Sequence, residues 1–405
     1  MKNNKYPEIR FAGFTDDWEQ RKLGDVFTQT VEYVNPKEEN LELWSVTVEK
    51  GLTPKTARYN REALVKKTDK FKTVHPGDIV YNPMNMTIGS VGFNKSDKTV
   101  AVSGYYVTMT MNEGYSNNYF NTWLPSSNAI QMYKLYATGT LIEKQRVQFP
   151  TLSAIKTAIP SFEEQTKIGS FFKQLDDTIA LHQCELDTLK ETKQGFLQKM
   201  FPKSGAKVPK VRFAGFTDDW EQRKLGDLAN IVRGASPRPI QDPKWFDENS
   251  EVGWLRIADV TEQNGRIHNL EQKISEAGQE KTRVLVEPHL LLSIAATVGK
   301  PVVNYVKTGV HDGFLIFLNP LFYREFMFQW LEMFRPKWQK YGQPGSQVNL
   351  NSELVRNQEI AIPTMEEQKK ISNFFKQLDD TIALHQRELD LLKETKKGFL
   401  QKMFY

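Results

Sequence analysis

Two stretches of the chain carry the same long pattern of apolar and polar positions. In residues 161–201, apolar side chains recur at alternating steps of four and three, the heptad pattern of a helix that packs along another helix. The blocks FFKQLDDTIALHQ and GFLQKMF return unchanged in residues 364–404. Each stretch follows a proline and begins with an S/T-x-x-E capping box, which Ser161 and Glu164 form in the first copy. The pattern predicts two helices of about 60 Å each.

An apolar stripe on one such helix needs a partner, and the second helix is the simplest one. We therefore expect the two helices to pair as an antiparallel coiled coil. His182 and Lys193 interrupt the first stripe, as polar residues do where they fix the register of a coiled coil. The seam is predicted to contain Phe172, Leu175, Ile179, Leu186, Leu189, Phe375, Leu378, Ile382, Leu389 and Leu392.

A second repeat defines the domain organisation. The leader RFAGFTDDWEQRKLGD occurs at Arg10–Asp25 and again, unchanged, at Arg212–Asp227. The chain is therefore two tandem modules, each with a leader, an insert that differs between the copies, and a heptad helix. The inserts have nearly equal lengths of 135 and 136 residues. The expected domains are 1–160, 161–203, 204–363 and 364–405.

Within the inserts the local signals are mixed α/β. Apolar runs bounded by Gly, Pro and Asn predict strands at 78–81, 102–109, 290–294 and 314–318, and helices are predicted at 119–136 and 322–334. The inserts share a skeleton, in which residues 89–92 are taken to correspond to 296–299. The predicted fold class is α+β, with two pseudo-symmetric modules that each place a mixed α/β domain before a long helix.

Identical scaffolds around different inserts favour a function with one constant and one variable part. Drift after a duplication would change leaders and inserts alike, yet the leaders are identical and the inserts largely are not. We infer that the leaders and helices meet the same structure twice, whereas the inserts recognise two different targets. DNA is the obvious target with two separated parts, because its successive faces recur every ~34 Å.

Charge within the inserts adds partial support for DNA. The first insert has 15 Lys+Arg against 11 Asp+Glu, and the second has 15 of each. A solvated surface explains any single basic residue, but the local clusters together favour phosphate and base contacts. The candidate DNA-binding residues are Lys55, Arg58, Arg61, Lys66, Lys67, Lys70, Arg233, Ser236, Arg238, Arg335, Lys337, Lys340, Gln343 and Gln347.

The sequence lacks the motifs of the common catalytic sites. No GxxxxGK[ST] loop or strand-following Gly-rich cofactor loop occurs, and Tyr81-Asn82-Pro83-Met84 only partly matches the N-P-P-[YF] element of amino-methyltransferases. The six histidines are scattered and the single cysteine is Cys184, so we expect no metal site and no disulfide. With no secretory signal or apolar run of 18 residues, we expect a cytoplasmic, non-catalytic protein.

The chain resembles a known family, the specificity (S) subunits of type I restriction–modification enzymes. The resemblance covers nearly the whole chain. It rests on I-P-x-x-x-E-Q-x-x-I at the entry into each helix, W-x-x-x-x-L-G-D in each leader and the tail that ends in L-Q-K-M-F. The loop Arg-Gly-Ala-Ser-Pro at 233–237 also resembles that family's target recognition domains, whereas residues 31–46 of the first insert depart from this pattern.

The resemblance implies the partners and their chemistry. Each insert would be a target recognition domain for one half of a bipartite, asymmetric site in double-stranded DNA, and the helix pair would set the spacer. Two modification (methyltransferase) subunits would dock on the repeated elements and carry S-adenosylmethionine. Restriction (translocase and nuclease) subunits would add the chemistry that needs ATP and Mg, so that no cofactor belongs to this chain.

Two other functions remain open at the level of sequence. The chain could be a stand-alone, sequence-specific DNA-binding regulator or adaptor with a coiled-coil spacer. It could also be a purely structural coiled-coil scaffold. Recruitment of a methyltransferase and retention on specific DNA distinguish these alternatives from a specificity subunit.

Overall fold

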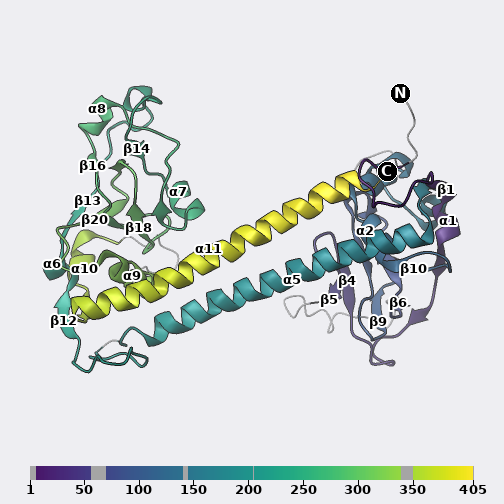
Figure 1. Ribbon diagram of the computed structural model, residues 1–405, viewed down its shortest axis with the longest axis horizontal. Coiled ribbons are helices and arrows are strands. Elements are labelled where there is room, and N and C mark those ends of the chain that lie inside the picture. The colour runs from purple at the N-terminus through teal and green to yellow at the C-terminus, as the bar shows by residue number, and fades with distance from the viewer. Residues whose placement is uncertain (1–5, 56–69, 140–144, 204, 339–349, 405) are drawn as a thin grey trace. The chain divides into compact units, whose positions relative to one another are not determined.

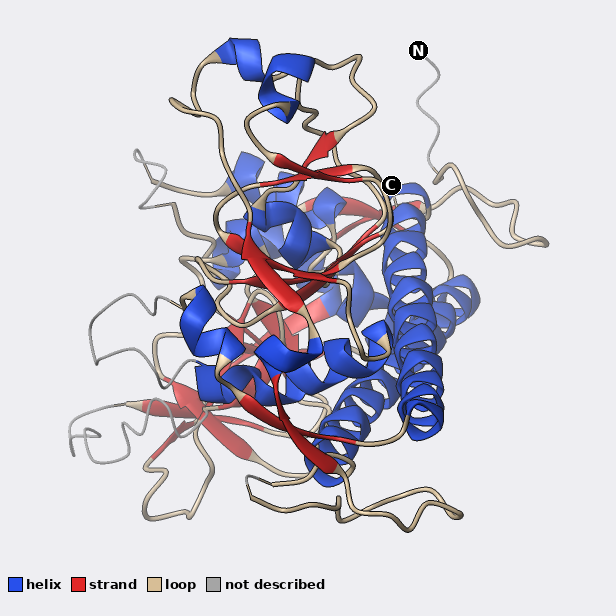
Figure 2. Cartoon of the chain, turned by 90° about the vertical axis from the view of Figure 1, so that its left-hand side faces the viewer, coloured by secondary structure: helices blue, strands red, loops and turns tan. Residues whose placement is uncertain are grey.

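The computed structural model describes residues 6–55, 70–139, 145–203, 205–338 and 350–404. The chain divides into two compact units, of which unit 1 is residues 1–183 with 387–405 and unit 2 is residues 184–386. The helices α5 (Phe162–Lys199) and α11 (Met365–Lys402) are unbroken over 38 residues each (Figures 1 and 2). Each unit thus contains a leader, an insert, the start of its own module's helix and the end of the other module's helix. No helix in the described ranges is long and apolar enough to cross a membrane.

Unit 1 combines short sheets with small helices. Before α5 its elements are β1 (Glu19–Lys22), α1 (Leu23–Val26), β2 (Phe27–Thr30), β3 (Tyr33–Val34), β4 (Trp44–Thr47), β5 (Gly51–Pro54), β6 (Phe71–Val74), β7 (Ile79–Tyr81), η3 (Met86–Ile88), β8 (Val91–Phe93), β9 (Val100–Ser103), β10 (Val107–Met111), α2 (Asn117–Trp123), α3 (Ser127–Tyr136), α4 (Phe149–Ala154) and β11 (Lys156–Ile159).

Unit 2 repeats this plan with its own additions. Before α11 its elements are β12 (Glu221–Lys224), α6 (Leu225–Leu228), β13 (Asn230–Arg233), η5 (Pro243–Trp245), β14 (Gly253–Trp254), α7 (Ile257–Glu262), β15 (Arg266–Ile267), α8 (Glu276–Gln279), β16 (Arg283–Leu285), β17 (Leu290–Ser293), β18 (Pro301–Asn304), β19 (Thr308–Val310), β20 (Phe314–Leu318), α9 (Arg324–Trp338), α10 (Ser352–Arg356) and β21 (Glu359–Ile362).

The main sheets of the two units have the same topology. Unit 1 has the order β2-β10-β7-β8, and unit 2 has β13-β20-β17-β18 with β15 added in parallel at the edge. In each unit the leader strand also pairs antiparallel with the strand before the long helix, as β1 with β11 and β12 with β21. The predicted α+β class with two pseudo-symmetric modules is confirmed.

The remaining strands differ between the units and give each insert its own shape. Unit 1 adds a β3-β6-β9 sheet and a β4-β5 hairpin, whereas unit 2 adds a β14-β19-β16 sheet. The main apolar core of each unit lies between its main sheet, its helices and the ends of α5 and α11. A smaller core under the added strands supports each insert separately.

The start of each long helix fastens three parts of its unit together. In unit 1 the carboxylate of Glu164, which is 1% exposed, accepts hydrogen bonds from Arg10 Nε and Nη2 at 2.6 and 2.7 Å and from Trp18 Nε1 at 3.2 Å. The next residue, Gln165, accepts from the backbone N–H of Ser116 just before α2 and donates to the carbonyl of Pro160. The E-Q pair therefore joins leader, insert and helix.

Unit 2 builds the same junction from the second copy. Glu367 accepts from Arg212 Nε and Nη2 at 2.7 and 2.8 Å, and Gln368 accepts from the N–H of Tyr323 before α9. The sequence pattern misassigned these two glutamates in one respect. Ser161 and Thr364 do cap the helices, but the carboxylates that a capping box would return to the cap serve the leader arginines instead.

The apolar tail of each long helix completes the core of the unit that contains it. Phe404 stacks on Phe172 in unit 1 at a centroid distance of 5.6 Å, and Phe201 stacks on Phe375 in unit 2 at 6.1 Å. The backbone supports this packing, since Ile9 donates to the carbonyl of Lys402. In both units the helix end thus lies against the leader and runs antiparallel to the helix start.

Two elements predicted as single are each divided. The predicted strand 102–109 is β9 and β10, because a turn at Gly104 sends the chain from the β3-β6-β9 sheet into the main sheet. The predicted helix 119–136 is α2 and α3, which Pro125 separates. Ser126 caps α3 by accepting from the N–H of Ala129.

The strand registers also correct the predicted match between residues 89–92 and 296–299 of the two inserts. The strand registers pair Ile79 with Phe93 and Leu290 with Val303, so β7 matches β17 and β8 matches β18. Gly89, rather than Gly92, then corresponds to Gly299. Both glycines lie two residues before the following strand and take positive φ angles of 90° and 78°, a conformation that other residues rarely adopt.

Replacing Glu164 by Ala should unfold unit 1 more easily, because it leaves the Arg10 guanidinium without its partner in a largely buried site. The expected loss is about 3 kcal/mol, measured by denaturant unfolding, with hydrogen exchange rising around the leader and the start of α5. Glu163→Ala is the matched control, since Glu163 is the exposed neighbour in the same helical turn. Equal losses for the two variants would contradict this role of Glu164.

Candidate nucleic-acid interface

In unit 2 a polar surface lies at one end of the main sheet. The loop after β13 and the turn before β20 meet there, where Gly234 donates to the carbonyl of Phe314 and Ala235 to that of Val310, at 2.9 and 3.0 Å. A Cβ on Gly234 would lie 2.1 Å from the carbonyl oxygen of His311, so only glycine allows this approach. The two backbone segments therefore hold each other in place.

Asp312 brings three of the candidate DNA-binding residues together. Its Oδ1 accepts from the hydroxyl of Ser236 and its Oδ2 from Arg238 Nη2, both at 2.7 Å, while its carbonyl accepts from Arg233 Nε at 2.6 Å. Burial alone would raise the pKa of Asp312, but the Ser236 hydrogen bond and the two arginine charges hold it below its ordinary value. The carboxylate is thus charged at neutral pH.

The other candidates of the second insert lie at or beyond the end of α9. Arg335 is half-buried close to Gly299, since a Cβ added to that glycine would lie 3.2 Å from Arg335 Cγ. In the same loop Ile294 donates to the carbonyl of Gly313 in the 311–313 turn. Lys337 is exposed and lies 4.8 Å from the ring centre of Phe334. Lys340, Gln343 and Gln347 lie outside the described residues.

Unit 1 has different side chains at the equivalent end of its main sheet. The exposed ring of Tyr33, three residues beyond β2, has the ammonium groups of Lys70 and Lys72 at 5.4 and 5.8 Å from its centre. Lys72 donates to the carbonyl of Tyr106 at 2.7 Å, and burial lowers its pKa. Of the first cluster, Lys55 is exposed just after β5, whereas Arg58, Arg61, Lys66 and Lys67 lie outside the described residues.

Sequence reasoning missed part of this surface. Tyr105 follows the Gly104 turn, is 45% exposed and has the Arg146 guanidinium 6.0 Å from its ring centre. Exposed cations and tyrosine hydroxyls both suit contacts to the phosphates of duplex DNA. The signal was present as a tyrosine pair after a glycine, but only the fold brings Arg146 next to it.

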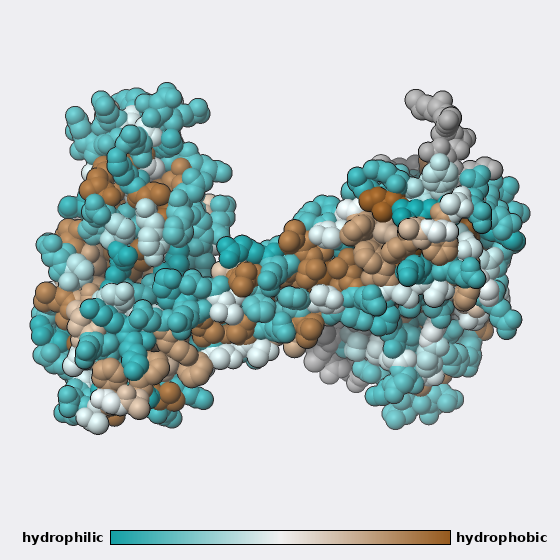
Figure 3. Space-filling view, in the orientation of Figure 1, coloured by the Kyte–Doolittle hydropathy of each residue, from teal (hydrophilic) through white to brown (hydrophobic). Residues whose placement is uncertain are grey.

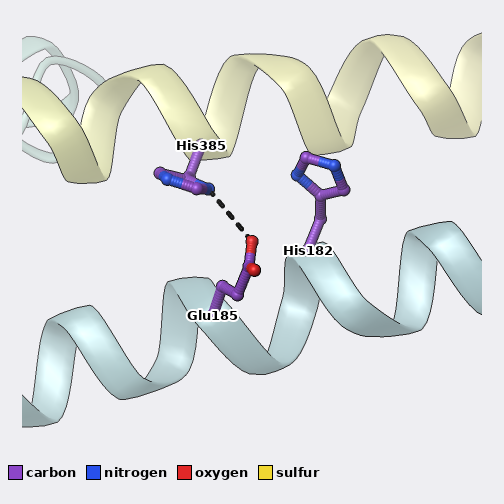
Figure 4. A group of neighbouring side chains, drawn as sticks. All are labelled: His182, Glu185 and His385. Carbon is purple, nitrogen blue, oxygen red and sulfur yellow. Dashed lines mark ion pairs between the residues drawn. The ribbon is translucent and has the colours of Figure 1, made fainter.

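The predicted seam positions of the helices are all buried or half-buried in their own units. Polar residues pair across the helices as well. His385 Nδ1 lies 3.7 Å from Glu185 Oε2 in unit 2 (Figure 4), and His182 Nδ1 lies 3.8 Å from Glu388 Oε2 in unit 1. Lys193 pairs with Asp379 at 2.5 Å. These pairs repeat at equivalent positions, so they favour one antiparallel register.

Comparison with known proteins identifies the family. The family model of the type I restriction modification DNA specificity domain matches residues 15–191 and again residues 217–394. The chain belongs to this family. It is a DNA specificity subunit, which recognises DNA and leaves catalysis to other subunits.

Individual relatives of the specificity subunit align with it over nearly their whole lengths. The type I restriction enzyme MjaVIII specificity subunit of Methanocaldococcus jannaschii is 21% identical, and the alignment covers 98% of this chain and 95% of the relative. The S subunit structure from M. genitalium has a TM-score of 0.61 at 13% identity and 99% coverage of both chains. A chain from a type I R-M system, solved to describe complex assembly and conformational transition, has a TM-score of 0.58 at 16% identity and 96% and 97% coverage.

Lys70 of the specificity subunit should contribute phosphate affinity without sequence preference. Lys70→Gln is expected to weaken binding to specific and unrelated duplexes alike and to reduce the slope of log K against log salt by about one. Fluorescence anisotropy at several salt concentrations measures both quantities. Lys98→Gln is the control, because Lys98 is exposed near the opposite end of β9. A loss confined to one DNA sequence would contradict the phosphate role.

Proposed function

We propose that each insert of this specificity subunit reads one half of a bipartite, asymmetric site in double-stranded DNA. The supporting observation is that both units present a surface at the same end of the same four-stranded sheet, with different side chains. Unit 2 presents the arginines around Asp312, and unit 1 presents Tyr33 and Tyr105 with their neighbouring cations. One fold with two chemistries suits two different half-sites.

The long helices would set the spacer between the two half-sites. Each is continuous over 38 residues, and each unit contains an antiparallel pair of helix segments with a largely apolar seam. Helices paired in a single register fix a length that a flexible linker of the same composition would not. This proposal makes the helices a constant part of recognition that the inserts do not alter.

Two modification subunits would dock on surfaces that the repeats present twice. Leu181 and Leu384 occupy the same repeat position and are 58% and 48% exposed, and Phe162 and Met365, at another shared position, are 53% and 43% exposed. Hydrophobic side chains also line the visible side of α11 (Figure 3). Apolar residues exposed at equivalent positions would offer the same contact to two copies of one partner.

The partners would supply the chemistry and its cofactors. Modification subunits would carry S-adenosylmethionine for methylation, and restriction subunits, held through them, would use ATP and Mg. This chain would act in the cytoplasm with its DNA and hold no cofactor. The solved relative from a type I R-M complex supports assembly with such subunits in general.

Exchanging the first insert, Val26–Pro160, for that of another specificity subunit should change one half of the methylated motif only. The reason is that the first insert lies within its own compact unit and has the same four-stranded topology as the second. Methylome sequencing of cells that also express the modification partner measures both halves at once. The matched control exchanges Leu228–Pro363 and should change the other half.

A change in both halves after one exchange would contradict one reader for each half. Site-specific DNA binding without any recruited methyltransferase would instead favour a stand-alone regulator. If the chain neither selects a DNA sequence nor recruits a methyltransferase, the structural scaffold is the remaining function.

Leu181→Glu or Leu384→Glu should each remove one of the two bound modification subunits, and the double variant should remove both. A buried, unpaired carboxylate in each apolar contact opposes docking. Native mass spectrometry of the assembled complex counts the subunits. Leu391→Glu is the control, because Leu391 is 69% exposed but its repeat counterpart is Thr188. Two bound subunits on the double variant would exclude this surface.

A further inference from the structure

We propose that unit 2 contains a guanine-reading site in which Arg233 contacts the base, the backbone carbonyl of Asp312 holds the arginine, and the Asp312 carboxylate holds the loop that carries it. The inference rests on the proposed function and adds the base class that one half-site must contain. The site consists of the loop Arg233–Arg238 after β13 and the turn His311–Gly313 before β20.

The backbone under the arginine is held from three sides. Arg233 is the last residue of β13 and pairs with Leu315 of β20. Its carbonyl accepts from Arg283 Nε at 2.8 Å, and the hydroxyl of Thr282 donates to the carbonyl of Ala235 at 2.6 Å. A base-reading side chain gains specificity from such a rigid origin, because less conformational freedom is lost on binding.

The turn that faces the loop is equally fixed. The His311 ring packs against Trp254 and Phe314, with ring centres 5.8 and 4.8 Å away. Its Nδ1 accepts from the N–H of Gly313 at 2.9 Å, which assigns the ring proton to Nε2. Burial lowers the pKa of His311, so the ring is neutral and acts as a packed support. Asp312 is thus presented from a rigid turn.

Hydrogen bonding to Asp312 leaves a usable fork on Arg233. Only Nε of Arg233 is bound, to the Asp312 carbonyl, and within the described part of the chain its two terminal amino groups make no hydrogen bond. Both Asp312 carboxylate oxygens are already bound, to Ser236 and Arg238. Asp312 is therefore poorly suited to accept from cytosine N4, whereas the free arginine fork matches the paired acceptors N7 and O6 of guanine.

Unit 1 lacks this arrangement at the equivalent place. Glu32 and Tyr33 follow β2 where the arginine loop follows β13, and Gly104 with Tyr105 precedes β10 where Asp312 precedes β20. Among the described residues, guanine reading by an arginine held from this turn is therefore proposed for the second half-site alone. This difference provides an internal control in every experiment.

The test replaces the guanine N7 acceptor in the motif that methylome sequencing defines. In duplexes with 7-deazaguanine at one guanine of the unit 2 half-site, the assembled complex should bind about tenfold more weakly. Arg233→Ala should bind weakly but equally to guanine and 7-deazaguanine. Lys307→Ala, an exposed cation of unit 2 paired with Glu251, should keep the wild-type difference.

The positioning role of Asp312 has its own readout. Asp312→Asn keeps the carbonyl that binds Arg233 but weakens the carboxylate contacts with Ser236 and Arg238. The loop that carries Arg233 is then held less firmly, so methylation should relax at the same base position while the other half-site stays fully selected and the thermal midpoint stays unchanged. Equal relaxation of both half-sites would reduce Asp312 to a structural residue and overturn its role.

The outcomes separate this inference from the function on which it rests. A bipartite motif whose unit 2 half has no guanine, or one insensitive to 7-deazaguanine at every guanine, overturns the inference and leaves the function intact. The inference is also overturned if the Arg233→Ala variant still binds guanine duplexes more tightly than 7-deazaguanine duplexes. If no motif is selected at all, the proposed function and the inference fail together.

Discussion

A buried glutamate at the start of each long helix is the contact on which the rest of the structure depends. Glu164 and Glu367 each bind a leader arginine with two hydrogen bonds, and the following glutamine binds the insert. A buried carboxylate of this kind is costly without its partner. The contact therefore couples the leader, the insert and the helix of each unit to one another.

Each unit is completed by the helix end of the other module. The tail with Phe404 belongs to the core of unit 1, and the tail with Phe201 belongs to that of unit 2. Both tails have the same sequence and pack in the same way against the leader and the helix start. The constant parts are thus constrained by each other, whereas the outer surfaces of the inserts are free to differ. This division explains how one scaffold can present two unrelated reading surfaces.

Local pattern was enough to predict the parts of the fold that depend on periodicity. The long helices and the strands β17 and β20 follow from spacing within short windows, and the two modules follow from sequence identity between distant segments. Prediction failed where a distant contact decided the outcome. Glu164 has the spacing of a capping residue, yet its carboxylate binds Arg10, 154 positions away. The predicted strand 102–109 could not be divided at Gly104 without knowing that its two halves join different sheets.

The candidate site shows the same limit. The cluster at Arg233, Ser236 and Arg238 is visible in the sequence, but Asp312, which organises it, lies more than 70 positions further on. Tyr33 and Arg146 become candidates only in the folded chain, where Tyr33 lies beside Lys70 and Arg146 beside Tyr105. Residue types predicted a DNA-binding surface. Tertiary contacts are needed to say which side chains of each surface would recognise DNA.

The most direct test of this account is the methylome of cells that express the intact chain with its modification partner. We predict one asymmetric motif with two specified halves and a spacer of constant length. A continuous motif, a palindromic motif or a variable spacer would contradict recognition by two different units on one fixed pair of helices.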